Sequence, residues 1–145
     1  YVFPFAQQLA ETSREAIRKV ILAGQRDGLT VDEMTARLRE VFADWPESRA
    51  RMVARTETIR ASNAGAMLGY QEAGVKLFEW LPASDACPYC AALRGKRWAA
   101  GAELFRLGEL WHPEGVERPY RIDYEPVRHP PLHPHCRCTL VPVVD

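Results

Sequence analysis

Cys87-Pro88-Tyr89-Cys90 and His133-Pro134-His135-Cys136-Arg137-Cys138 are the two stretches of sequence that decide how this chain folds. They hold all four cysteines of the 145 residues and lie well apart along the chain. Each is typical of a tight turn that offers soft ligands to one metal ion. The spacing therefore predicts one structural zinc site that joins the two stretches.

Five side chains compete for the four positions of a tetrahedral zinc ion. The two turns mirror each other, with a proline after the first ligand of each, if the ligands are Cys87, Cys90, His133 and Cys136. Cys138 is the reserve ligand, because Cys136 and Cys138 would face the same side of a following strand. His135 is expected to be an exposed loop histidine.

Two other interpretations of the cysteines remain open. They could form two disulfides, or Cys87 and Cys90 could form a redox-active pair of the thioredoxin kind. A redox pair would lack the βαβ setting in which a Cys-x-x-Cys motif works. A closed zinc site would instead be a staple for a part of the chain whose own core is small.

The composition fits one domain. A hydrophobic content of 47% with 10% aromatic residues is enough to build a core. The sequence has no run near the roughly 20 apolar residues of a membrane span, and no signal-peptide pattern, so we expect a soluble protein in a reducing cytosol. Because the chain begins at Tyr1 without a methionine, we expect it to belong to a longer protein with further domains.

The charges of the chain cancel, with 19 basic and 19 acidic side chains. No overall field would draw the chain onto nucleic acid. Two local basic clusters are interpreted mainly as solvated or ion-paired surface, with nucleic-acid contact as the alternative. They consist of Arg49, Arg51, Arg55 and Arg60, and of Arg94, Lys96 and Arg97.

The first half of the sequence predicts three helices. A capping-box spacing at residues 12–15 predicts a first helix from near Ser13 to the glycines at 24 and 28, and the apolar residues 1–5 are expected to pack on a neighbouring segment. The same spacing at Thr30-Val31-Asp32-Glu33 predicts the start of the second helix. Its expected apolar face consists of Met34, Leu38, Val41 and Phe42.

The third helix is predicted to run from Glu47 to Glu72, because no proline or turn cluster interrupts these residues. Gly65 and Gly69 weaken a helix, so we expect another backbone to approach closely there. Three polar residues of this helix could be catalytic or could form a polar network that ties the helix to the C-terminal part, and we prefer the network. These residues are Arg55, Glu57 and Asn63.

The second half predicts a small antiparallel sheet with long loops. A strand at 75–80 is expected to pair with a strand at 138–143, and a short return strand is expected at 96–98. Residues 91–95 suggest one helical turn, and residues 99–130 a long ordered loop with a hairpin near 120–127. The fold class is therefore α+β, with a helical part over residues 1–74 and a zinc-stapled part over residues 75–145.

Several separated motifs in this order resemble the phage Mu F-like head morphogenesis domain. They are Ala54-Arg55-Thr56-Glu57, Asn63, Gly74, Trp80, Asp85, Cys87-Pro88-x-Cys90, Leu93-x-Gly95 and Pro131-x-His133-Pro134-x-Cys136-Arg137-Cys138. The resemblance covers nearly the whole chain. It implies a low-copy minor capsid protein of the virion, associated with the portal and located inside the capsid or near the portal. Such a protein would be assembled in the host cytoplasm and act in head assembly, DNA packaging or DNA delivery.

The expected partners are the portal and other head proteins, with contact to packaged DNA left open and neither a membrane nor a small-molecule substrate expected. A non-enzymatic structural role is the main hypothesis. The alternatives are a zinc-dependent nuclease or toxin domain and a zinc-stapled nucleic-acid binder. His112, His129 and His135 are the histidines that a nuclease could use, but hydrolysis would also need a second, oxygen-rich metal site.

Overall fold

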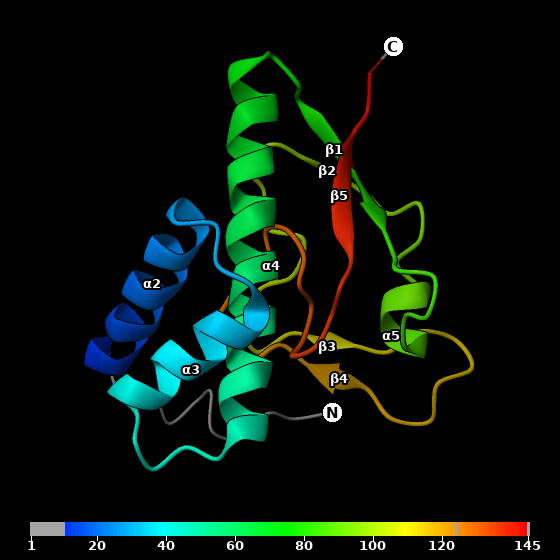
Figure 1. Cartoon of the computed structure of the whole chain (residues 1–145). Helices are drawn as coiled ribbons and strands as arrows, with labels where there is room; N and C mark the ends of the chain where they lie inside the picture. Colours follow the sequence, from blue (N-terminus) through cyan, green and yellow to red (C-terminus); the bar gives the residue numbers. More distant parts are fainter. Residues whose placement is uncertain (1–10, 124, 145) are drawn as a thin grey trace.

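A computed structural model describes residues 11–123 and 125–144 of the chain (Figure 1). Three helices come first: α2 (Glu11–Arg26), α3 (Val31–Val41) and α4 (Glu47–Glu72). They are followed by β1 (Leu77–Leu81), α5 (Pro88–Ala91), β2 (Arg97–Ala99), β3 (Leu110–Trp111), β4 (Tyr120–Arg121) and β5 (Thr139–Pro142). This order of elements confirms an α+β fold in which helices precede a small antiparallel sheet. The expected packing of residues 1–5 lies outside the described residues.

The start of α3 has the predicted capping box. The Thr30 hydroxyl accepts a hydrogen bond from the Glu33 backbone N–H (3.2 Å), and the Glu33 carboxylate accepts one from the Thr30 backbone N–H (3.1 Å). Two backbone donors that the helix itself cannot satisfy are thereby paired. Gly28, with φ of 69°, provides the left-handed turn between α2 and α3.

The described part of α2 begins at Glu11, two residues before the predicted start near Ser13. One expectation about α3 was wrong. Val41 is 53% exposed, and Thr35 is buried in the apolar stripe of α3 instead. The Thr35 hydroxyl donates to the Val31 carbonyl (2.7 Å), so its burial leaves no unpaired polar group, which a hydrophobicity pattern does not reveal.

The long helix α4 has the predicted bounds, with 26 residues. Figure 1 shows it as a central column between α2 and α3 on one side and the sheet on the other. Ala50, Val53 and Ala54 near its start pack with residues of α2 and α3, whereas Met67 near its end belongs to the core beneath the sheet. The helix thus joins two separate clusters of buried residues.

The expected close backbone approach at Gly65 and Gly69 was wrong. A Cβ atom at either glycine would have no neighbouring heavy atom of the described residues within 4 Å, and both glycines are exposed. They lie on the solvent-facing side of α4, so no close contact there compensates for the loss of helix stability that glycine causes.

The sheet has the strand order β2-β1-β5, and both pairings are antiparallel. The strand at 75–80 pairs with the C-terminal strand and the return strand as predicted, with Phe78 opposite Trp98 and Trp80 opposite Leu140. Phe78 and Trp80 are fully buried and lie in the second core. Among the described helices, none combines the length and the apolar character needed to cross a membrane.

The predicted hairpin near 120–127 was wrong. Tyr120 pairs with Trp111 across β3 and β4, and Val127 forms an isolated bridge with Phe105, so the described residues show no hairpin confined to 120–127. The α-helical turn is α5, which begins three residues before the predicted turn at 91–95; the Arg94 N–H still donates to the Ala91 carbonyl (3.2 Å), and Gly95, with φ of 79°, ends the turn. Pro88 occupies the first turn of α5, where its fixed φ and missing N–H suit a helix start.

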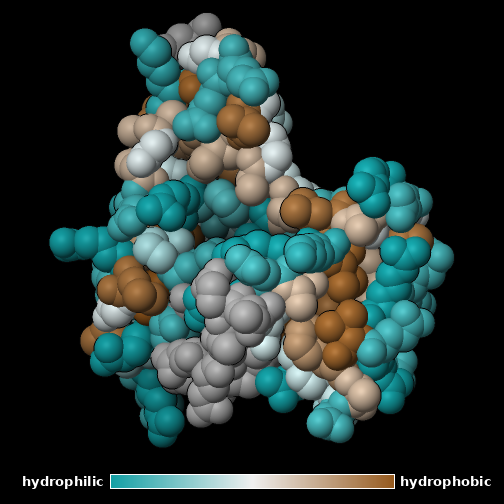
Figure 2. All heavy atoms as spheres, turned by 90° about the vertical axis from the view of Figure 1, so that its left-hand side faces the viewer, coloured by the Kyte–Doolittle hydropathy of each residue, from teal (hydrophilic) through white to brown (hydrophobic). Residues whose placement is uncertain are grey.

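Large apolar side chains are exposed at separate places, including Leu22 on α2 and Leu68 on α4. Figure 2 shows this mixture on the helical side, where hydrophilic residues surround separate hydrophobic areas. Leu107, before β3, and Leu110, the first residue of β3, are exposed as well.

Candidate metal centre

The first two sulfur ligands are positioned by α5. Cys87 is the residue before the helix, and its carbonyl accepts a hydrogen bond from the Ala91 backbone N–H (2.8 Å). Cys90 follows three residues later, so both side chains project from one side of the turn. Cys90 is buried and Cys87 half-buried.

The second turn is closed by the Cys136 backbone N–H, which donates to the His133 carbonyl (3.1 Å). Between them His135 has φ of 65°, a left-handed conformation that residues other than glycine seldom adopt. Its backbone N–H donates to the Thr56 hydroxyl on α4 (3.0 Å). This bond ties the turn to the long helix, and the side chain of His135 is exposed as predicted.

The predicted ligand atoms converge. Nε2 of His133 lies 3.0 Å from Sγ of Cys87 and 3.1 Å from Sγ of Cys90, and Sγ of Cys90 lies 3.7 Å from Sγ of Cys136. Zinc–sulfur bonds of about 2.3 Å at a tetrahedral angle place two sulfurs about 3.8 Å apart. The Cys90–Cys136 separation therefore suits two thiolates that share one metal ion.

The donors form two overlapping groups, each with all its ligand atoms within 4.8 Å of one another. One group is Cys87, Cys90 and His133, and the other is Cys90, Cys136 and Cys138. Cys90 belongs to both. This cluster could hold a metal ion, and an ion bound by either group would take a fourth ligand from the other.

His133 is oriented as a metal ligand requires. Its Nδ1–H donates to the Pro134 carbonyl (2.7 Å), which leaves Nε2 directed at the two sulfurs. A second hydrogen bond of this kind fixes the tautomer of metal-binding histidines in general. Burial is the main cause that lowers the pKa of His133, which favours the neutral imidazole that binds metal.

The thiols share their protons unevenly. The thiols of Cys136 and Cys90 can donate hydrogen bonds to the sulfur of Cys138. These hydrogen bonds lower the pKa of Cys138, whereas the pKa values of Cys90 and Cys136 are raised. The backbone of Ala83 also favours the Cys138 thiolate. The indole N–H of Trp80 is buried and forms no hydrogen bond with the described residues. The lowered pKa favours the thiolate form that binds metal, so Cys138 is a candidate ligand beside Cys136.

All four cysteines are free thiols in the structure. The 3.7 Å between Sγ of Cys90 and Cys136 is far beyond the roughly 2.05 Å of a disulfide bond. The sulfurs are thus close enough to share a metal ion without being bonded to each other.

Asn63 ties α4 to the strand that follows the second turn. Its Nδ2 donates to the Cys138 carbonyl (3.2 Å), and its Oδ1 accepts from the Leu140 backbone N–H (3.4 Å). The residue is 5% exposed. The predicted polar network is confirmed here, because the amide joins the long helix to the C-terminal part.

Glu57 belongs to a second polar contact. Arg60 donates both to Glu57 (3.1 Å) and to Glu125 (2.7 Å), which connects α4 to the loop after β4. Burial raises the pKa of Glu57, and the charge of Arg60 opposes this. Arg55 was expected in the same network, but it forms no hydrogen bond or ion pair with any described residue.

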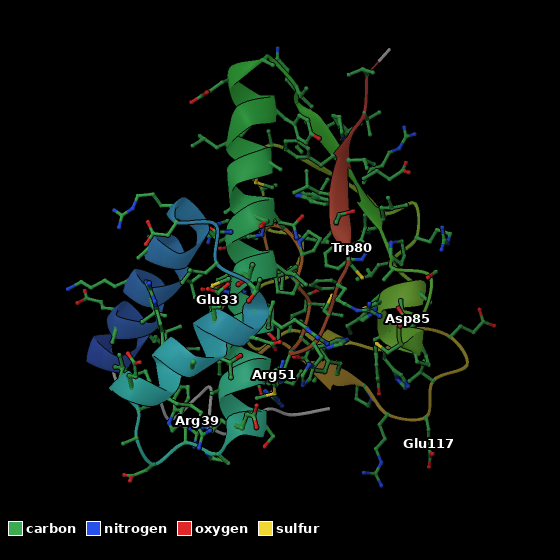
Figure 3. The ribbon with its side chains drawn as sticks, viewed as in Figure 1. Glu33, Arg39, Arg51, Trp80, Asp85 and Glu117 are labelled. Carbon is green, nitrogen blue, oxygen red and sulfur yellow. The ribbon has the colours of Figure 1, made fainter. Side chains whose placement is uncertain are left out.

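Arg55 instead lines a cleft that opens onto the donor cluster. The five ligand side chains, Asp85, His135 and Arg137 also line it. Asp85 lies on the loop before α5 (Figure 3) and forms an ion pair with Arg137. His112 and His129 do not line the cleft; each bonds to a backbone carbonyl elsewhere, Val116 (2.7 Å) and Pro130 (2.7 Å).

The roles of Thr56 and of the Pro134 carbonyl at the site could not be predicted from the sequence. Nothing in the sequence marks a carbonyl as the partner of a histidine ring. A threonine at the third position of Ala54-Arg55-Thr56-Glu57, next to small residues in a helix, was the only available signal for a buried contact.

These features define a small α+β protein in which a Cys/His cluster brings α5 and the second turn together, and hydrogen bonds from Thr56 and Asn63 tie that turn and β5 to a long central helix. A family model described as Phage Mu protein F like protein matches residues 15–141, and the chain belongs to this family. The family is one of structural, head-morphogenesis proteins of phages, which supports a head-morphogenesis function, association with the virion and interaction with other head proteins. No curated protein and no solved structure matches the chain.

Proposed function

We propose that the chain is a minor capsid module of a tailed phage or prophage, present in few copies beside the portal, that acts in head assembly, DNA packaging or DNA delivery. The observation that carries this proposal is the family match, because it spans both the long helix and the two cysteine-containing turns. We regard residues 1–145 as one Mu F-like domain of a longer protein.

The metal in this proposal is a single structural zinc ion. Thiolate and imidazole donors with separations near those of a tetrahedron suit zinc better than calcium or magnesium, which prefer oxygen. Its first-choice ligands are Cys87, Cys90, His133 and Cys136, with Cys138 as the alternative to Cys136. The ion would clamp the ends of the segment between the two turns, whose own strands are only two or three residues long.

The role of the zinc ion in this proposal is to stabilise the folded state. Closing a long loop through a metal restricts the unfolded chain, and the binding energy of the metal adds to the folding energy. The turn that carries His133 is also bonded to α4 through Thr56. The zinc ion would therefore hold the sheet half against a helix that is already well packed on the other side.

The partners in this proposal are the portal and other head proteins. Exposed leucines on α2 and α4 offer apolar contacts for them. Contact with packaged DNA belongs to the proposal as a secondary interaction, because the net charge of zero favours no broad electrostatic attachment.

The proposal is tested by binding of the purified chain to a portal protein from the same phage or prophage, compared with binding of a Leu22→Asp, Leu68→Asp double variant. Saturable binding to the portal without metal-dependent loss of added DNA or RNA supports the head role. Absence of portal binding together with metal-dependent nucleic-acid cleavage would replace it with a nuclease.

Zinc is tested separately, by elemental analysis of freshly purified protein and a thiol count after denaturation with chelator. One zinc per chain with four free thiols is expected. Absence of metal together with absence of free thiols would mean disulfides.

A further inference from the structure

The guanidinium of Arg55 is a positive charge without a hydrogen-bond or ion-pair partner among residues 11–123 and 125–144. It is half-buried on α4 and lines the cleft that opens onto the sulfur ligands. No described carboxylate lies within ion-pair distance of it, whereas Arg51, one turn earlier on the same helix, pairs with Asp32 and Glu47. The other fixed charges of the cleft, Asp85 and Arg137, pair with each other.

Arg55 is close to the second turn. It lines the same cleft as His135, the residue directly before Cys136. The backbone of His135 is held against Thr56, the neighbour of Arg55 on α4. Arg55 and the sulfur ligands therefore line one cleft, beside the second turn.

The ligand geometry limits the charge of the centre. The two donor groups together contain four cysteines and His133. A set of four ligands that includes His133 therefore contains three cysteines. His133 belongs in the set because its Nε2 is directed at two of the sulfurs. A divalent ion with three thiolates and one neutral imidazole carries one net negative charge.

We propose that the centre binds its metal through His133 and three thiolates, and that Arg55 supplies the positive charge that balances it. This inference rests on the proposed zinc site. Arg55 would act on the centre through its charge and would not be a metal ligand. Four thiolates would leave an excess negative charge in the cleft, and two would leave Arg55 unbalanced.

The test is the zinc dissociation constant, measured at fixed pH by competition with a chromophoric chelator. Arg55→Gln is expected to weaken zinc binding by about 10- to 100-fold, the range found when groups around metal ligands are removed. Arg55→Lys, which keeps the charge, should recover most of the affinity. Arg51→Gln is the matched control, and its exposed ion pairs should leave the affinity nearly unchanged.

The number of thiolates is read from the charge-transfer absorption of the cobalt-substituted protein and from the protons released on zinc binding. Three thiolates are expected; two or four would overturn the proposed ligand set. Equal zinc affinities of Arg55→Gln and Arg51→Gln, with helical circular dichroism intact, would overturn the role of Arg55 while leaving the zinc site standing. Failure of the unaltered chain to bind zinc would refute the proposed zinc site itself.

Discussion

Asn63→Ala is expected to be among the most damaging single changes outside the metal centre. The Asn63 side chain satisfies the Cys138 carbonyl and the Leu140 N–H, and it is 5% exposed. A buried backbone group left without a partner costs about 1–3 kcal/mol, so two such groups cost about 2–6 kcal/mol. That is a large part of the roughly 5–15 kcal/mol by which ordinary domains are stable.

Urea unfolding, followed by circular dichroism on the zinc-loaded chain, measures this cost. Asn63→Leu keeps much of the side-chain volume, so it separates the lost hydrogen bonds from the cavity. Ser62→Ala, at an exposed neighbouring position, should change the free energy of unfolding by less than about 0.5 kcal/mol. If Asn63→Ala also stayed within about 0.5 kcal/mol, or if Asn63→Leu fully restored stability, the reasoning would be refuted.

Four further outcomes are expected. Gly65→Ala should stabilise the protein by about 0.8–1.0 kcal/mol in urea unfolding, because the added methyl group meets open space on a helix; destabilisation would show a contact that the structure lacks. Cys90→Ala should abolish metal binding and lower the melting temperature while most helical circular dichroism remains, and an unchanged melting temperature would contradict the zinc staple. Cys136→Ser should weaken zinc binding more than Cys138→Ser in chelator competition, whereas the reverse order would make Cys138 the ligand. The pKa of His129 is lowered mainly by burial, so the folded state resists its protonation and stability should fall as the pH drops below about 6.5; the His129→Gln variant should lose that part of the pH dependence in melting experiments.

Local signals explain what could be predicted of the fold. The capping box at Thr30 and the uninterrupted run from Glu47 to Glu72 depend on neighbours in sequence, and both were confirmed. The pairings of Phe105 with Val127 and of Trp111 with Tyr120 could not be predicted, because they bring together strands too short to show an alternating pattern.

The types of donor residue at the site could be predicted, but the tertiary contacts that hold the two turns in place could not. Spacing alone singled out the four cysteines and His133, which the structure brings together, since a metal constrains residue type and turn length together. The contacts of Thr56 with His135 and of Asn63 with Leu140 depend on how α4 lies against the second turn. Such tertiary contacts leave no periodic trace, so Asn63 was predicted as a member of a network without its partners.

The tryptophans of the chain are divided unequally between its two cores. Trp45 packs with the helices, stacked on Phe42, whereas Trp80, Trp98 and Trp111 lie in or against the core of the sheet. The indole N–H of Trp111 donates to the carbonyl of Tyr89, between the first two cysteines (3.0 Å). The intrinsic fluorescence of the protein is therefore mainly an optical reporter of the sheet half, and a titration with zinc could be followed by emission without any added dye.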